Sequence, residues 1–232
     1  MANLTRGDIE RMIQARRNEA WERAKSSYHW ENRSLEEKEE QVVHEESSIE
    51  LNLMGVNLSG VDLSHLHLLS VNLKRANLRK ATLYETNLVR ADLERADLRE
   101  AYMDRANLFG ANLSNANLSN ASLVDAKLIM AELPGAKLQY ANLTGSDFSG
   151  SNLNYADLRG AILHGARVGS TERRYGIVVS SGGILNADFR LADLRGADFS
   201  NAERQRLVTA NFREAIYDHT TRWPVGFDPS IV

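Results

Sequence analysis

A period of five residues runs through the middle of this sequence. An apolar residue stands at every fifth position from Leu53 to Val168, and it is leucine except at Met103, Phe148 and Val168. Two residues before it stands a small or β-branched residue, most often Ala, and the position between them is usually Asn or Asp. Typical units read RANLR, RADLE, GANLS and NANLS. An internal repeat of this kind has to be explained before any single residue is interpreted.

Neither regular secondary structure can bury this period. A helix turns about 100° per residue, so leucines spaced by five would scatter around its surface. On a strand, side chains alternate with period two, so successive leucines would point to opposite faces. A chain that turns a corner once per five residues keeps every leucine inside. Four such sides close a square coil, and the coils stack at about the 4.8 Å spacing of paired strands.

The tandem A-(N/D)-L-x-x pattern resembles the pentapeptide-repeat proteins. The resemblance implies an all-β solenoid, a right-handed quadrilateral β-helix of about seven to eight coils, preceded here by an N-terminal α-helical segment. It also implies that function must be argued from the surface, because this scaffold serves unrelated roles.

Changes of composition divide the chain into three parts. Residues 1–50 are predicted to form a helical segment that either caps the first coil or covers one side of the solenoid. Residues 51–223 are predicted to form the β-helix, which a projecting loop at 169–183 interrupts. Repeats resume out of register at Ile184 and slip again around Glu203 to Arg206. Residues 224–232 form a C-terminal tail, and with Trp223 they carry the aromatic residues of a lid. The tail resembles those of family members from photosynthetic bacteria, which implies a bacterial source.

Two helices are expected before the repeats. Asp8 is a predicted N-cap of the first, and Ser34 with Glu37 forms a predicted capping box for the second. The apolar positions of the first helix recur at helical spacing; they are Ile9, Met12, Ile13, Ala20, Ala24 and Tyr28. Trp21 and Trp30 are expected to bury against the solenoid. The alternative is a solvated, charged leader.

The last residue of each unit indicates the backbone conformation at the corner. Glycine stands there at many units, which indicates a left-handed backbone conformation. Between Arg75 and Arg105 the same place holds Arg, Lys or Glu instead. A different class of turn is therefore predicted for those coils.

One predicted face carries apolar residues on its outer side. Taking every fourth unit, the residue after the central leucine reads Leu69, Val89, Phe109 and Ile129, followed by Ser149. We call these four residues the apolar ladder; they are the candidate contact surface. Exposed, contiguous apolar patches usually mark contacts. Covering of the ladder by segments of the chain itself is the favoured expectation. The second N-terminal helix is long enough to cover it, and the centre of the 169–183 loop, from Tyr175 to Val179, could form a short hairpin or lie on it. A partner or homodimer surface is the alternative.

Catalytic and cofactor chemistry find no support in the sequence. It has no cysteine, no phosphate-binding glycine loop and no nucleophile motif. His65 and His67 have a metal-like spacing, yet on a cornered coil they point from different faces. We therefore predict no enzyme activity, no cofactor and no metal. The N-terminus lacks an apolar signal core, and no apolar run is long enough for a membrane span, so a soluble, cytoplasmic protein is expected.

The leading functional hypothesis is a non-catalytic scaffold for protein–protein interaction with an unidentified protein partner. The alternative comes from the family resemblance: a DNA mimic that regulates a type II topoisomerase such as DNA gyrase. Mimicry calls for an acidic surface, whereas residues 51–168 hold eleven Asp or Glu against twelve Lys or Arg. Direct nucleic-acid binding through Lys74, Arg75, Arg79 and Lys80 is disfavoured by the interleaved carboxylates.

Overall fold

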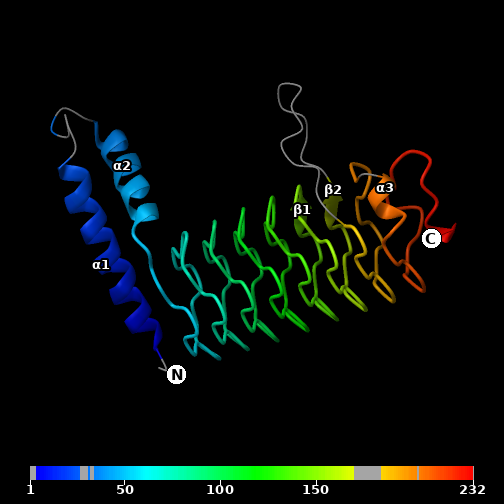
Figure 1. The fold of residues 1–232 in the computed structure, drawn as a ribbon, viewed down its shortest axis with the longest axis horizontal. Coiled ribbons are helices and arrows are strands. Elements are labelled where there is room, and N and C mark those ends of the chain that lie inside the picture. Colours follow the sequence, from blue (N-terminus) through cyan, green and yellow to red (C-terminus); the bar gives the residue numbers. More distant parts are fainter. Residues whose placement is uncertain (1–3, 27–30, 32–33, 170–183, 203, 232) are drawn as a thin grey trace.

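The computed structural model describes residues 4–26, 31, 34–169, 184–202 and 204–231. A solenoid of stacked square coils forms the body, with two helices at its N-terminal end (Figure 1). Parallel bridges join residues twenty positions apart, from Asn52–Asn72 to Asn142–Ile162. Because four units of five residues make one coil, each leucine lies directly above the leucine of the coil below. The predicted right-handed quadrilateral β-helix is confirmed.

The Asn or Asp of each unit has a backbone role that explains its recurrence. In the unit 72–76, the N–H of Asn72 donates to the preceding coil, and those of Leu73 and Arg75 donate to the following coil. The N–H of Ala76 donates across the corner to the carbonyl of Leu73. The remaining N–H, that of Lys74, donates to the Asn72 side chain at 3.2 Å. Every amide of the unit therefore has an acceptor, as backbone buried in a solenoid requires.

The corners all share one backbone conformation, so the prediction of a second turn class is wrong. Gly55 and Gly110 have φ of 67° and 62°, and Arg75 and Lys80 have φ of 55° and 60° at the equivalent place. A left-handed conformation costs a non-glycine residue about 1–2 kcal/mol. The repeating inter-coil hydrogen bonds impose this conformation even where the residue does not favour it.

Helix α1 spans Arg6–Lys25 and helix α2 spans Leu35–Ser48. The capping box at Ser34 and Glu37 is confirmed. The predicted cap at Asp8 is corrected: Thr5 is the N-cap of α1, and Asp8 is its capping-box partner three residues later. Both Thr5 and Asp8 are residue types that serve as N-caps, and the reciprocal hydrogen bonds between them place the cap at Thr5.

The two halves of α1 pack on different partners. Ile9 is fully buried in the solenoid core, and Met12 and Ile13 pack against the same core, as do the large inner residues of the first coil. The second half packs on α2 instead, where Ala20 and Ala24 bury Val42. Trp21 is 39% exposed, so its predicted burial is wrong, and Trp30 lies outside the described residues. The buried side of this half of α1 is formed by the smaller residues Ala20 and Ala24 and not by Trp21.

Two three-residue strands and two short helices complete the elements. β1 (Asp147–Ser149) pairs in parallel with β2 (Arg167–Gly169) at the same twenty-residue spacing. Residues 170–183, where a projecting loop is predicted, lie outside the described residues. Beyond them the register changes, since Asp157 pairs with Asp188. The helix α3 spans Arg204–Leu207 and the 3-10 helix η2 spans Pro229–Ile231.

An aromatic cluster fills the C-terminal end of the core. Phe199 stacks on Trp223 with ring centroids 4.9 Å apart, and Phe212 meets both Trp223 and Phe227 edge-on. The predicted aromatic lid is confirmed. Large rings take the place of leucine in these last layers of the core.

Candidate functional site

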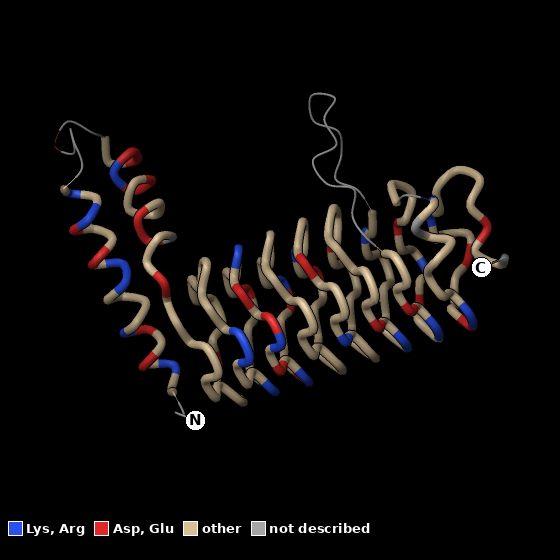
Figure 2. The backbone as a smooth tube through the Cα atoms, in the orientation of Figure 1, with Lys and Arg blue, Asp and Glu red and all other residues tan. Residues whose placement is uncertain are grey.

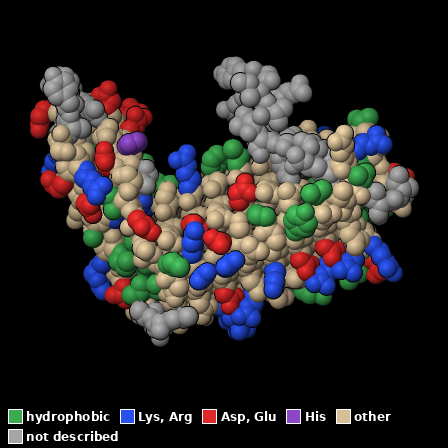
Figure 3. Space-filling model, viewed as in Figure 1, with side chains coloured by type: hydrophobic (Ala, Val, Ile, Leu, Met, Phe, Trp, Pro, Cys, Tyr) green, Lys and Arg blue, Asp and Glu red, His purple; other side chains and the backbone are tan. Residues whose placement is uncertain are grey.

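The apolar ladder lies on one face of the solenoid. The bridges His67–Asn87, Asn87–Asn107 and Asn107–Lys127 place the four units of the ladder in one column. Phe109 is 38% exposed, and Leu69, Val89 and Ile129 are half-buried. The same face carries β1 and β2 one and two coils further on. Hydrophobic side chains are visible along the upper edge of the solenoid in Figure 3, on the side where Figure 1 shows β1.

Helix α2 does not cover this ladder, so the expectation that this helix forms the cover is wrong; the loop, the other segment expected to cover it, lies outside the described residues at 170–183. Its buried side packs on α1 through Val42, in a cluster that contains no ladder residue. The helix stands at the N-terminal end of the solenoid (Figure 1). Arg16 secures this position: its guanidinium donates to the carbonyl of Glu46 at 2.8 Å and to that of Leu69 at 2.7 Å. This second bond joins the helical pair to the first unit of the ladder.

The flanks of the ladder are basic. Arg90 follows Val89 in its unit, and Lys127 precedes Leu128 in the unit of Ile129. Both side chains are exposed. Among the described residues, neither cation has an ion pair or a side-chain hydrogen bond. Most other cations of the coils have one.

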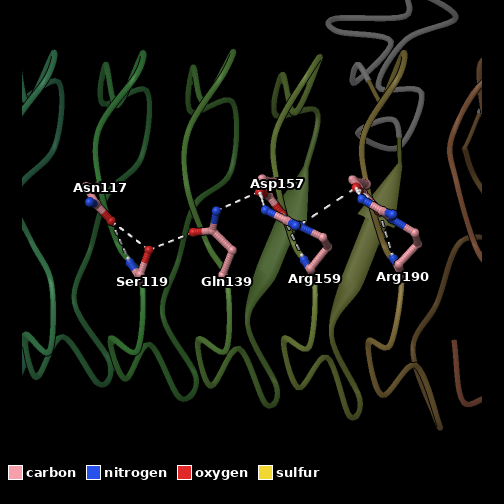
Figure 4. Close-up of polar contacts among 7 residues, drawn as sticks. Asn117, Ser119, Gln139, Asp157, Arg159 and Arg190 are labelled. Carbon is pink, nitrogen blue, oxygen red and sulfur yellow. Dashed lines mark hydrogen bonds and ion pairs between the residues drawn. The ribbon is translucent and has the colours of Figure 1, made fainter. Parts of the chain in front are cut away.

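The opposite face of the solenoid is polar and was missed in the sequence. We call it the arginine face; its central residues run from Leu58 to Phe212, ten positions from those of the ladder face. A chain of side-chain contacts crosses its coils (Figure 4). Ser119 Oγ lies 2.7 Å from Asn117 and 2.6 Å from Gln139, and Gln139 donates to Asp157 at 2.6 Å.

The network continues through paired arginines. Arg159 donates to both oxygens of Asp157, at 2.8 and 2.6 Å, and its Nε lies 3.9 Å from Asp188. Arg190 donates to Asp188 in turn, with its shortest bond at 2.7 Å. Burial by itself raises the pKa of Asp157, but hydrogen bonds from Arg159 and Gln139 outweigh it and lower the pKa. These guanidinium groups are held in place by carboxylates of their own face.

A groove of about 370 Å³ opens beside this network. Three arginines line it together with an acid and two exposed apolar residues; the lining is Gln139, Tyr140, Arg159, Arg190, Leu191, Arg213 and Glu214. Arg213 pairs with Glu214 at 3.2 Å. Asp157 and Asp188 stand behind the lining and pair with Arg159 and Arg190. Because each guanidinium group thus has a carboxylate partner, the groove has no excess charge with which to attract an ion. The repeated Asp-Leu-Arg triplets, such as 157–159, were the available signal for this pairing.

The histidines do not form a metal site. His65 lies 3.4 Å from Glu85 and edge-on to Tyr84, while His67 belongs to the next side of the coil. Within the described ranges, no three His, Asp or Glu side chains are grouped closely enough to bind a metal ion.

Charge is interleaved over the whole solenoid. Figure 2 shows Lys and Arg beside Asp and Glu along successive coils. Typical pairs are Arg79 with Glu100 and Lys74 with Asp92. Such exposed pairs contribute about 0–1 kcal/mol each and mainly keep the surface hydrated.

Comparison with solved structures finds pentapeptide-repeat proteins. HetL, which is involved in heterocyst differentiation regulation in the cyanobacterium Nostoc sp. strain PCC 7120, is 25% identical over 76% of this chain and 93% of its own, with a TM-score of 0.34. Rfr23 from the cyanobacterium Cyanothece 51142 is 24% identical over 75% and 90%, with a TM-score of 0.29. QnrB1, a plasmid-mediated fluoroquinolone resistance protein, is 18% identical over 74% and 82%, with a TM-score of 0.41. A comparison with curated protein sequences found no match.

These likenesses do not transfer a function, because identity and TM-score are low. A similar protein comes from the Arabidopsis thaliana thylakoid lumen, at 25% identity over 65% of this chain and 69% of its own, with a TM-score of 0.24. The cytoplasmic location stays a prediction. Among the described helices, none is both long and apolar enough to cross a bilayer.

The family assignment rests on the repeats themselves. The model of pentapeptide repeats matches in 8 copies at residues 52–88, 76–115, 86–125, 101–139, 126–165 and 185–203, which together exceed half of the chain. The matched units are those that form the stacked coils and their leucine core. This chain belongs to the pentapeptide repeat family.

Proposed function

We propose that this chain is a non-catalytic scaffold that binds a protein partner through the apolar ladder. The observation that carries the proposal is Phe109, an aromatic residue 38% exposed in the middle of a column of apolar residues. The other exposed positions of these coils are largely polar or charged. Aromatic and aliphatic anchors at the centre of a patch supply most of the binding energy at protein interfaces.

The rigidity of the solenoid supports a scaffold role. Each coil is tied to its neighbours by backbone hydrogen bonds at every side, and the interior is filled by leucine and alanine. Little conformational entropy is lost when such a surface docks. The filled interior also leaves no enclosed pocket between the coils for a substrate.

The test compares two triple variants. Val89→Ser, Phe109→Ser and Ile129→Ser together remove three of the four apolar side chains of the ladder. The matched control, Tyr102→Ser, Tyr155→Ser and Ile162→Ser, removes three exposed apolar residues from other positions. Both are used, beside the wild type, as bait in extracts of the native cells. We expect a protein that the wild type and the control capture, and that the ladder variant loses.

The homodimer alternative is tested by sedimentation velocity, which measures the assembly state of the purified wild type and of both variants. A dimer that only the ladder variant loses would make a second copy the partner. The proposal is overturned if the ladder variant keeps both the captured proteins and the assembly state of the wild type. Unchanged circular dichroism of both variants establishes that the fold is retained.

A further inference from the structure

The surroundings of the ladder indicate which chemistry a partner must have. One side of the ladder is lined by His67, Asn87, Asn107 and Lys127, and the other by Ser70, Arg90, Gly110 and Met130. Neither list contains a carboxylate. The first acid of this face is Asp147, and it is paired with Arg167 at 3.2 Å. Within the described residues, the ladder is therefore an apolar strip with one cation that has no ion pair on each flank, and the exposed Asp125 stands at the corner before Lys127.

On the face that follows the ladder face along the chain, the acids are already engaged. Asp92 lies 3.1 Å from the Lys74 ammonium and accepts a hydrogen bond from Asn112. Glu132 accepts from Asn152 at 2.7 Å. Arg90 and Lys127 are thus able to form ion pairs with a bound molecule, although carboxylates are common on the solenoid as a whole.

The spacing of the ladder selects a helix over a strand. Successive ladder residues are one coil apart, about 4.8 Å. A helix repeats its surface every 5.4 Å, so its apolar side chains stay close to register over three coils. Side chains on one side of an extended strand repeat at about 6.6–6.8 Å and lose register within two coils.

We propose that the apolar ladder binds an acidic amphipathic helix of a protein partner. This inference rests on the proposed function and specifies its partner. The apolar stripe of the helix lies along Leu69, Val89, Phe109 and Ile129, and its acidic flanks meet Arg90 on one side and Lys127 on the other. The glutamate-rich α2 stands at the first coil (Figure 1). Because the N-terminal end of a helix is positively polarised, the negative charge of α2 favours a bound helix whose N-terminal end lies at the first coil.

A pair of synthetic peptides tests the chemistry directly. Both are about 18 residues long, because shorter helices are marginal in water. They share leucines at helical spacing and alanines, and the remaining positions are Glu in one peptide and Lys in the other. Fluorescence anisotropy measures their binding to the full chain over a series of salt concentrations. We expect the Glu peptide to bind about tenfold more tightly than the Lys peptide, and added salt to weaken it.

Charge reversal locates the site. Arg90→Glu with Lys127→Glu should weaken the Glu peptide by about tenfold. The control is Arg75→Glu with Lys137→Glu, two exposed cations on other faces at the same places within their units. Arg75 and Arg90 also share φ of 55°. The control should bind the Glu peptide as the wild type does. Arg90→Gln with Lys127→Gln provides a milder variant if reversal perturbs the fold.

The inference is overturned if the wild type does not bind the Glu peptide, if the Lys peptide binds as tightly, or if both Arg90/Lys127 variants bind like the control. The proposed function is judged separately by the serine variants and captured proteins. Loss of a partner by the ladder variant, together with failure of the Glu peptide, would leave the scaffold function standing and discard the acidic helix.

Discussion

At the scale of single residues, buried polar groups position the N-terminal helices. Arg16 is only 4% exposed, and burial lowers the pKa of its guanidinium. It is retained there because its donors reach carbonyls of two other segments, at Glu46 and Leu69. A buried donor with partners is tolerated, whereas the loss of either side leaves an unsatisfied group.

Arg16→Met should loosen the helical pair. The substitution keeps an apolar stem but removes the donors, and leaving the Leu69 carbonyl unsatisfied should cost about 1–3 kcal/mol. Hydrogen exchange of α1 amides should accelerate, and the midpoint of denaturant unfolding should fall. Arg17→Met, at an exposed neighbouring position, should change stability by less than about 0.5 kcal/mol. Equal effects of the two substitutions would contradict the role of Arg16.

Gly169 is required by a close approach of backbone. Its φ is 150°, and an added Cβ would lie 2.8 Å from the Ala202 nitrogen. At Gly55, with φ of 67°, an added Cβ would meet nothing within 4 Å. We expect Gly169→Ala to lower the free energy of unfolding by about 1–3 kcal/mol more than Gly55→Ala, which carries the backbone term alone. Thermal unfolding of the two variants measures the difference, and equal midpoints would refute it.

At the scale of the coil, the repeat is a unit of both hydrogen bonding and packing. Bridges join residues twenty positions apart from one coil to the next, and this spacing changes at the pair Asp157–Asp188. Because every coil contacts only its neighbours, stability is close to a sum over coils. Length can therefore change in whole coils without altering the fold.

Deletion in phase should be tolerated. Removal of residues 111–130 takes out one coil and joins Gly110 to Ala131 in frame, so we expect a folded, cooperatively melting protein. Removal of residues 111–128 breaks the frame and turns later leucines toward solvent. Circular dichroism and thermal melting should show loss of structure only for the second deletion. A stable product of the out-of-phase deletion would show that the leucine frame does not govern folding.

The Asp–Arg pairs within coils should make stability depend on acid. Hydrogen bonds from Arg99 and Arg195 lower the pKa of Asp97 and Asp193, and that of Asp157 is lowered as well. A carboxyl with a lowered folded-state pKa stabilises the fold above its unfolded value, near 3.9, and this contribution is lost as pH falls through the folded value.

Replacing all three aspartates by Asn isolates this effect. Asn is common at the equivalent place and keeps the backbone acceptor, as Asn72 does for Lys74. We expect little change of stability at pH 7, since exposed pairs are weak. Below about pH 4.5, the unfolding midpoint of the variant should fall less steeply than that of the wild type. Parallel curves for the two proteins would contradict the assignment.

At the scale of the whole molecule, the rod presents two opposite and chemically different faces. One carries the apolar ladder with unpaired cations, and the other carries the self-neutralised arginine network. Positive and negative side chains are mixed along the solenoid as a whole (Figure 2). Such a surface does not reproduce the uniform negative charge of a DNA backbone.

This charge pattern predicts no effect on DNA gyrase. Residues 51–168 carry eleven acids against twelve bases, so the chain should neither inhibit supercoiling nor protect the enzyme from a quinolone at micromolar concentration. A gyrase supercoiling assay with added protein measures this. Inhibition or protection would revive the DNA-mimic alternative and weaken the case for the ladder.

Much of the fold could be predicted from the residues because the relevant interactions are local. Each unit of five supplies its own corner, its own inward Ala and Leu, and the Asn or Asp that accepts a nearby N–H. The turn class was mispredicted because inter-coil hydrogen bonds hold Arg75 at a positive φ, whereas a non-glycine residue by itself prefers a negative φ. The candidate ladder could be read only by assuming four units per coil.

The period of five by itself determined the square solenoid, its leucine core and the column that holds Phe109. Tertiary structure alone decided that α2 packs on α1 away from the ladder and that Arg159 lies beside Asp188. It also decided that Arg90 and Lys127 have no ion pair in the part of the chain that the structure describes. The physical reason is sequence separation. The local contacts repeat in every unit, so the sequence of one unit is enough to predict them. The packing of a helix and the register across residues 170–183 depend instead on contacts between distant segments, which the sequence of a single unit does not specify.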